Sequence, residues 1–438
     1  MPDLIFARGQ MALSLAFHIV FAAVGVALPA LMVVAELLHR RTGDHVYLEL
    51  AHRWAKGTAI LFAVGAVSGT VLSFELGLLW PRFMAFGGAI IGMPFSLEGF
   101  AFFTEAVFLG IYLYGWERVS PRVHVLSGVA VSVSGALSAL FVVLANAWMN
   151  APAGFRMTGG VPTDVRPLAA MFSPGWAVEV GHVLLSSYLA TAAAMAAIHA
   201  LFLLRAPHSR FHRAALGIAM AFVVPAALLQ PISGDASARS VAVRQPAKLA
   251  ALEGQFDTER GAPLRLGGWP DPAAETTRYA LEIPYGLSFL AFHDPRAEVR
   301  GLASFPPRDR PDPRPVHVAF QIMVGCGSVL ALVALWWGVM WFRGRQRPGR
   351  EPSRSLLAAV AVCGPLGFLA IEAGWTVTEV GRQPWVVYGV VRTADAVTPV
   401  TGLVVPFALV TVVYATLGVV VAVLLGRLFL KTGDAHVG

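Results

Sequence analysis

Long apolar runs recur along the 438-residue chain, and they constrain its fold more than any other feature. A helix needs about 20 consecutive apolar residues to cross the hydrocarbon core of a bilayer. Only 13% of the residues are charged, too few to coat a water-soluble core of this size. We therefore predict an all-α polytopic membrane protein with nine transmembrane helices, at residues 10–38, 55–79, 87–115, 124–147, 176–204, 213–232, 316–342, 356–380 and 402–430. The sixth run is the shortest and contains Pro225 and Pro231.

The short loops predict the orientation of the chain. Lys and Arg gather in the loops after the odd-numbered spans, as at Arg40, Arg41, Arg118 and Arg122, and they are sparse in the alternate loops. Cytoplasmic loops carry such an excess, so we expect the N-terminus outside and the C-terminus inside. The net charge of +7 then reflects topology rather than nucleic-acid binding. The first run is too long for a signal-peptide core and has no small-residue cleavage site after it, so we expect a retained helix.

The segment 233–315 is too polar to lie in the membrane and divides the chain into spans at 1–232, this loop, and spans at 316–438. By the charge rule the loop is extracytoplasmic. Its first part predicts a short helix over 245–253, which places Lys248 and Glu253 one to two turns apart. After Gly254 we expect irregular structure. Polar loops of this length in membrane proteins are often functional, and this one could close over a ligand.

Ionisable side chains inside spans are expensive and mark functional candidates. Glu98 and Glu105 lie seven residues apart in the third span, on one helical face. They suit either a proton route or a pair of structural hydrogen-bonding carboxyls. His18 lies about 12 Å into the first span at about 1.5 Å per residue, as an iron ligand or an interhelical hydrogen-bonding group. Glu75, near the outer end of its span, is expected to reach the membrane surface.

The predicted topology brings further candidates to the level of His18, in the outer half of the membrane. His182 begins the fifth span, Met323 lies at a matching depth in the seventh, and Glu379 ends the eighth with Arg382 one turn beyond it. A His and a Met at one depth could form the axial pair of a low-spin haem. The remaining polar positions look structural: Asn146 and Asn150 as a helix cap, and His199 as a surface residue.

Seven motifs carry a resemblance to a known family. They are RGQMALSLAFHIVF, SLEGFAFFTEAVFLG, NAWMNAPAGF, GDASARSVAVRQPAKLAALEG, FQIMVGCG, IEAGWTVTEVGRQPW and GVVRTADAV, and they span nearly the whole chain. In sequence and order they resemble subunit I of the cytochrome bd quinol oxidases.

The resemblance implies a role for each candidate. His18 and Glu379 match the axial positions of two high-spin haems, and His182 and Met323 match the axial pair of a low-spin haem b. The remaining matches are Glu98 and Glu105 (oxygen-site carboxylates on the proton path), Lys248 and Glu253 (the quinol-loop pair), Trp375 (between haems) and Arg382 (beside the Glu ligand).

The family further implies a respiratory terminal oxidase of the bacterial cytoplasmic membrane. Such an enzyme oxidises quinol at the outer face, reduces O2 to water and builds a proton gradient without pumping. It implies a second, related membrane subunit (subunit II) and allows a small single-helix one. The short loop fits both high-spin pairs known in the family, haem b with haem d or two haems b.

Two departures leave alternatives open. Gln321 stands where some members carry an Arg, and the interval from Glu98 to Glu105 is one residue shorter than in some members. A haem-bearing electron carrier or oxygen sensor without quinol turnover would keep the same fold. A proton-coupled transporter using the two carboxylates would bind no haem. A haem–copper oxidase is disfavoured, because copper needs a cluster of intramembrane histidines.

Overall fold

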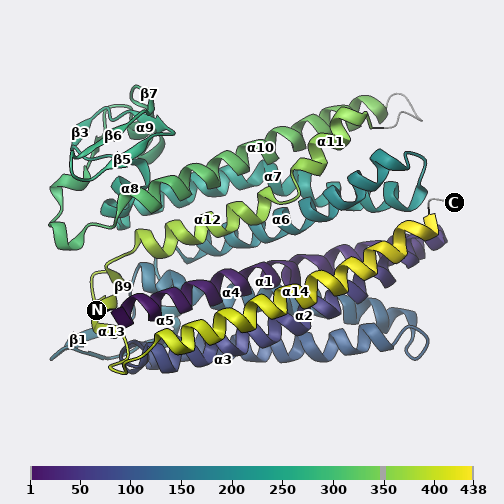
Figure 1. The fold of residues 1–438 in the computed structure, drawn as a ribbon, viewed down its shortest axis with the longest axis horizontal. Coiled ribbons are helices and arrows are strands. Elements are labelled where there is room, and N and C mark those ends of the chain that lie inside the picture. Colours follow the sequence, from purple (N-terminus) through teal and green to yellow (C-terminus); the bar gives the residue numbers. More distant parts are fainter. Residues whose placement is uncertain (1, 346–351, 437–438) are drawn as a thin grey trace.

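The computed structural model describes residues 2–345 and 352–436, and these form an elongated bundle of membrane-length helices (Figure 1). Within these ranges nine helical spans are long and apolar enough to cross a membrane, and each coincides with a predicted run. They are α1 (Pro2–Thr42), α2 (His45–Leu79), α3 (Pro81–Tyr114), α4 (Pro121–Asn150), α6 (Trp176–Arg205), α7 (Arg210–Arg244), α10 (Pro313–Arg345), α11 (Arg354–Val362) with α12 (Leu366–Gly381), and α14 (Val404–His436). Arg347 and Arg350 belong to the basic loop that is predicted to be cytoplasmic after the seventh span, and they lie outside the described residues.

The prediction that the sixth span is the shortest is wrong. α7 continues through Pro225 and Pro231, past residue 232, to Arg244. The hydropathy falls before the helix ends, because the last turns carry polar residues such as Asp235 and Arg239. These two pair one turn apart at 2.7 Å, which favours a helix in water as well as in lipid. The boundary expected at 232/233 therefore falls inside a helix.

The eighth span is broken rather than continuous. α11 ends at Val362 and α12 begins at Leu366, with Gly364 and Pro365 between them. A Cβ at Gly364 would lie 2.7 Å from the Cβ of Ala197 on α6. The break therefore lies where the chain packs too closely against α6 for a side chain.

Residues 245–312 gather at one end of the bundle, which we call the loop end; the N-terminus lies there too, and the C-terminus lies at the opposite end (Figure 1). The helix expected at 245–253 is present as α8 (Pro246–Glu253). The irregular structure expected after Gly254 is wrong. Three two-stranded antiparallel pairs form there: β3 (Glu259–Arg260) with β8 (Glu298–Val299), β4 (Leu264–Leu266) with β7 (Leu281–Ile283), and β5 (Trp269–Asp271) with β6 (Thr276–Arg278).

These strands escape sequence analysis because none exceeds three residues, too short for a visible alternation of apolar and polar residues. The same region holds α9 (Gly286–Phe292) and the 3-10 turns η1 (Leu302–Ser304) and η2 (Pro307–Asp309). Also at the loop end are β1 (Arg156–Thr158) with β2 (Val161–Thr163), α5 (Pro167–Met171), β9 (Trp385–Val387) with β10 (Val391–Arg392), and α13 (Thr393–Ala396).

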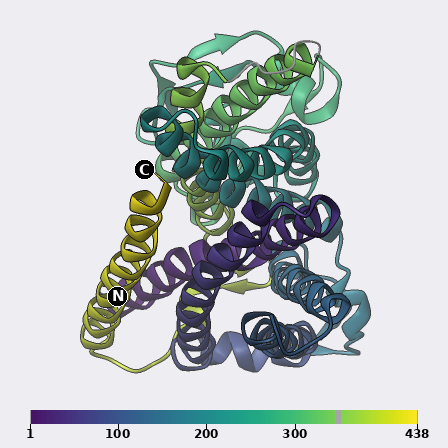
Figure 2. The same cartoon turned by 90° about the vertical axis from the view of Figure 1, so that its right-hand side faces the viewer.

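Helix packing fixes where the site can form. α1 crosses the middle of the bundle and contacts α2, α4 and α6, while α14 packs at its edge against α1 and α2 (Figure 2). The largest core cluster includes Leu31 and Met32 of α1, Leu50 of α2 and Leu216 of α7. All four are fully or almost fully buried. The cavity described below lies nearer the loop end than this closely packed cluster.

Candidate functional site

A cavity of about 860 Å³ lies between α1, α2, α3, α4, α6 and α12. This volume is within the range of small-molecule and cofactor sites. Six of the ten residues singled out in the sequence line it: His18, Glu98, Glu105, Trp375, Glu379 and Arg382. They come from α1, α3 and α12, with Arg382 just after the end of α12, so the fold brings together side chains separated by up to 364 residues, from 18 to 382.

The hydrogen bond of His18 fixes which ring nitrogen can bind a metal. Nδ1 lies 3.0 Å from Oγ of Ser68, and that hydroxyl donates to the carbonyl of Val64 at 2.9 Å. With the Ser68 proton directed to Val64, the Ser68 oxygen accepts from Nδ1–H, and on this basis we assign the lone pair of His18 to Nε2. Gly69 makes room for the ring, since a Cβ there would lie 2.9 Å from Cε1 of His18.

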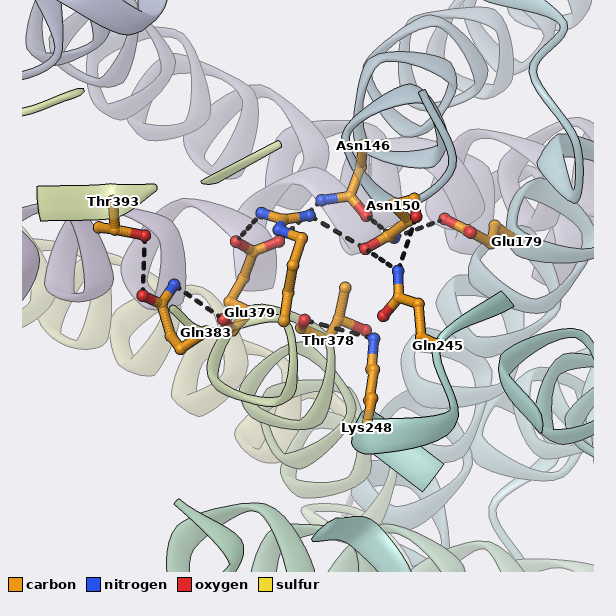
Figure 3. Close-up of polar contacts among 10 residues, drawn as sticks. Asn146, Asn150, Glu179, Gln245, Lys248, Thr378, Glu379, Gln383 and Thr393 are labelled. Atoms are coloured by element: carbon orange, nitrogen blue, oxygen red, sulfur yellow. Dashed lines mark hydrogen bonds and ion pairs between the residues drawn. The ribbon is translucent and has the colours of Figure 1, made fainter. Parts of the chain in front are cut away.

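Glu379 lies at the centre of a polar network (Figure 3). Asn146 Nδ2 donates to its Oε1 at 2.7 Å, and Arg382 Nη2 donates to its Oε2 at 2.5 Å. The Arg382 side chain is 1% exposed, whereas that of Glu379 is 30% exposed. A carboxylate held on both oxygens has a fixed position at the cavity wall.

The network continues from Arg382 to the loop end. Arg382 Nη1 donates to Asn150 Oδ1 at 3.1 Å, and Asn150 Nδ2 donates to Asn146 at 2.9 Å and to Glu179 at 3.1 Å. Gln245, just before α8, donates to the carbonyl of Asn150 at 2.8 Å. Asn146 and Asn150 are therefore not merely a helix cap, which corrects the sequence interpretation.

Asn146, Asn150, Glu179 and Gln245 were missed as site residues. The usable signal was the four-residue spacing of Asn146 and Asn150, which puts two amides on one face at the end of a span. Their partners could not be read from the sequence, because Asn146 and Glu379 are 233 residues apart.

Glu98 and Glu105 lie on the α3 side of the cavity. Ser138 of α4 donates to Glu98 Oε1 at 3.0 Å. Glu105 is 5% exposed and faces two glycines: a Cβ at Gly135 would lie 3.5 Å from both of its carboxyl oxygens. The small residues leave both carboxyls open toward the cavity rather than packed under apolar side chains.

His182 and Met323 lie outside the residues that line the cavity. His182 repeats the His18 arrangement: Nδ1 lies 2.9 Å from Oγ of Ser233 on α7, whose hydroxyl donates to the carbonyl of Gln230. By the same reasoning we assign the His182 lone pair to Nε2; Gln230 Nε2 lies 3.2 Å from that atom and 3.3 Å from Nδ1. Met323 packs between α10 and α12, and its Sδ would lie 3.1 Å from a Cβ at Gly374.

Lys248 and Glu253 are both buried on α8 and face different neighbours. Lys248 Nζ donates to the carbonyl of Thr378 at 3.3 Å, next to Glu379 in the chain (Figure 3). Burial lowers the pKa of Lys248 to about 8. Glu253 Oε2 has no hydrogen-bond partner among residues 2–345 and 352–436, and burial raises the pKa of Glu253 to about 8, partly opposed by the nearby Arg265.

Two further residues, His199 and Gln321, have environments that the sequence did not predict. His199, expected at the surface, is 3% exposed, and its Nδ1 lies 2.9 Å from Nδ1 of His212. Gln321 binds the loop: its Oε1 accepts from the amide of Gly267 at 3.0 Å, and its Nε2 donates to the carbonyl of Arg265 at 3.1 Å. An Arg could not reproduce the first of these bonds, because guanidinium has no acceptor.

The donor set fits haem iron, as the resemblance implies. Two histidines have Nε2 lone pairs fixed by serine hydroxyls, which is the second-shell arrangement of metal-ligating imidazoles. The cavity beside His18 also holds the anchored carboxylate of Glu379 and the indole of Trp375. A neutral imidazole and a carboxylate are both ligands that iron accepts.

Comparison with known proteins agrees with this fit. Residues 6–433 match the family described as cytochrome bd terminal oxidase subunit I. A Bacillus subtilis (strain 168) protein provisionally named cytochrome bd menaquinol oxidase subunit I is 40% identical over 98% of this chain and 97% of its own. Subunit 1 of the Escherichia coli (strain K12) cytochrome bd-II ubiquinol oxidase is 29% identical over 98% of this chain and 96% of its own.

Among solved structures, the bd oxidase from Geobacillus thermodenitrificans superposes with a TM-score of 0.91 at 37% identity, covering 98% of each chain. The match thus includes the loop end and every span that contributes to the cavity and the Glu379 network. The chain therefore belongs to the cytochrome bd terminal oxidase subunit I family.

Proposed function

We propose that this chain is the haem-bearing subunit of a respiratory oxidase that oxidises quinol at the loop end and reduces O2 to water in the cavity. Membership of the family makes it part of a quinol:O2 oxidoreductase. The observation that carries the finer proposal is the shared cavity. It gathers His18, Glu379, Glu98 and Glu105 in one space, and the hydrogen-bond network joins that space to α8.

The haem assignments rest on the lone pairs and anchors described above. His18 and Glu379 would hold the two high-spin haems beside the cavity, and His182 and Met323 would hold a low-spin haem b. Haem iron, when bound, supplies one-electron transfer and an open position for O2. The chain fixes ligand orientation through Ser68, Ser233, Asn146 and Arg382. The high-spin pair is b and d, or two haems b.

Quinol would bind beside α8. Once ionised, a buried carboxylate with an oxygen unpartnered among the described residues can accept a quinol hydroxyl proton, and the raised pKa of Glu253 makes it a stronger proton acceptor than an ordinary carboxylate. Lys248 provides a buried ammonium whose one hydrogen bond to the described residues is to a carbonyl at 3.3 Å, so it has donors left for the quinone oxygen.

The positions of the acidic groups suit a proton gradient without a pump. Glu98 and Glu105 follow one face of α3 from the cavity toward the opposite end of the bundle, where protons would be taken up. Protons from quinol would leave at the loop end, which we assign to the outer side of the bacterial cytoplasmic membrane. Reduction of O2 then separates charge because its protons and its electrons come from opposite sides.

The family usually pairs this subunit with a second membrane subunit, and we expect one here, with room for a small single-helix subunit. Three described spans have few buried residues in their most apolar stretch: 17% for α2, 17% for α10 and 11% for α14. Lipid or the second subunit would cover these faces.

The test is to measure quinol:O2 activity and haem content of the purified complex with Glu98→Gln. We expect the haem spectrum to be unchanged and oxygen consumption to fall by about 10²-fold or more, as for loss of a positioned proton donor. Full oxygen consumption would show that Glu98 has no such role. The exposed Glu298, paired only with Arg260 at 3.7 Å in the loop, provides the control Glu298→Gln, which should keep full activity.

A further inference from the structure

Helix α1 carries a polar stripe that the proposed function uses only in part. Gln10, Ser14 and His18 are spaced four residues apart, so they lie on one helical face. On α2, this stripe is contacted by Glu75 and Ser68, which are seven residues apart. His18 and Ser68 already have roles at the cavity. Glu75, expected at the membrane surface, is instead 3% exposed, so that expectation is wrong.

The contacts of Glu75 are one-sided. Its Oε1 accepts from Gln10 Nε2 at 2.9 Å and from Ser14 Oγ at 2.9 Å. Within the described part of the chain its Oε2 has no hydrogen-bond partner, and neither has Oε1 of Gln10. Both unpartnered atoms are acceptors if Glu75 is ionised, and they belong to two groups that are already joined.

No Lys, Arg or His in the described residues forms an ion pair with Glu75. An ionised carboxylate buried without a cation is strongly unfavourable in a protein interior. One proton removes this cost and accounts for both unpartnered oxygens. A protonated Oε2–H can donate to Oε1 of Gln10, while the Gln10 amide donates to Oε1 of Glu75, as in a cyclic acid–amide pair.

We propose that Glu75 and Gln10 form a buried proton-binding site beside the cavity, in which Glu75 carries the proton. This site is separate from Glu98 and Glu105, which reach the cavity from α3 on its other side. It gives the oxidase a second place near the cavity where a proton can be held or released.

The groups around the pair suit proton exchange. Tyr414 of α14 lies beside Ser14 and within electrostatic reach of Glu75. Its ring stacks on Phe17 with centroids 4.6 Å apart, which fixes the hydroxyl in place. Of the groups packed against Glu75, α14 contributes this titratable Tyr414, whereas α1 contributes Gln10 and Ser14, which do not ionise.

Ser14 lies one turn from His18, so the pair is close enough to respond to charge beside His18. Added positive charge there favours release of the Glu75 proton, and its removal favours proton binding. This link to the cavity rests on the proposed function, whereas the proton on Glu75 does not.

The experiment is infrared spectroscopy of the purified complex, in which the spectrum of Glu75→Gln is subtracted from that of the wild type. The isosteric amide keeps the pairing with Gln10 but cannot carry the acid proton. We expect the wild type to show the carbonyl band of a protonated carboxylic acid that Glu75→Gln lacks. Gln10→Leu keeps the acid and should shift that band to higher frequency, since its carbonyl loses a donor. This second variant tests the pair even where the first fails to assemble.

The control is Glu298→Gln, which removes an exposed carboxylate and should leave the band unchanged. Identical spectra for wild type and Glu75→Gln would overturn the proton site itself. For the link to the cavity, the haem midpoint potential is measured against pH. Its slope should be smaller in Glu75→Gln than in wild type and in Glu298→Gln. An equal slope, with the infrared band lost, would overturn the link and leave the proton site in place.

Discussion

At the scale of single residues, His18 depends on the absence of a side chain at Gly69. A methyl group at that position would lie 2.9 Å from Cε1 of His18, closer than carbon atoms approach without a shift. We expect Gly69→Ala to displace the ring and to lower bound haem or activity by about 10- to 100-fold. Haem per protein, measured as pyridine haemochrome, checks this.

Gly77→Ala is the matched control on the same helix. A Cβ at Gly77 meets nothing within 4 Å, so this change should be neutral or stabilising by up to about 1 kcal/mol. Equal haem content in both variants would contradict the steric argument at Gly69.

Two serines provide a second test because each holds one histidine. Ser68→Ala removes the acceptor for Nδ1–H of His18, and Ser233→Ala removes it for His182. We expect Ser233→Ala to change the spectrum or potential of the low-spin haem alone, and Ser68→Ala to change the high-spin signals alone. Ser73→Ala and Ser237→Ala are controls, since each hydroxyl bonds only to a backbone carbonyl. Overlapping changes would count against separate sites.

At the scale of elements, α8 carries two buried groups whose pKa values move in opposite directions. Burial raises the pKa of Glu253 from 4.5 to about 8, so folded α8 holds the extra proton and loses stability as the pH rises through that interval. Burial lowers the pKa of Lys248 from 10.5 to about 8, so the unfolded segment holds the extra proton and α8 gains stability above pH 8.

We therefore expect protection of the α8 amides from hydrogen exchange, corrected for intrinsic rates, to be lowest near pH 8. Glu253→Gln should remove the decline on the acid side, and Lys248→Met should remove the rise on the alkaline side. A protection profile that is flat in the wild type would show that neither group changes its pKa on folding.

The elements also show what a single sequence can and cannot predict. The nine spans were predictable because each must bury about 20 apolar residues, a local property. The end of α7 was not, since its last turns are held by the pair of Asp235 and Arg239 rather than by hydropathy. The small strands at the loop end were not predictable either, because none exceeds three residues and some, such as those of Glu259 and Val299, pair with distant parts of the chain.

The residues of the candidate site were also predictable only in part. The residue types that could bind iron stood out because a His or Glu inside an apolar run is costly. Their supporting partners did not, because Asn146 and Ser68 are ordinary residues until the fold places them against Glu379 and His18. Sequence reasoning therefore finds ionisable side chains that are costly to bury, and it misses the neutral side chains whose hydrogen bonds offset that cost.

At the scale of the whole molecule, the proposed charge separation requires the loop end to face outward. The charge rule predicts this orientation from the short loops alone. Thr276→Cys places a thiol in an exposed strand at the loop end, and Glu117→Cys places one in an exposed turn between α3 and α4 at the opposite end. The native Cys326 and Cys363 are 9% and 4% exposed, so their background labelling should be low.

With a membrane-impermeant maleimide on intact cells, we expect Thr276→Cys to be labelled and Glu117→Cys to be labelled only after the cells are opened. Labelling of Glu117→Cys in intact cells, with Thr276→Cys protected, would reverse the orientation. Quinol protons would then be released inside the cell while oxygen reduction took its protons from outside, so the gradient would have the wrong sign to conserve energy. The labelling pattern therefore decides whether the arrangement of α8, the network and the cavity can conserve energy at all.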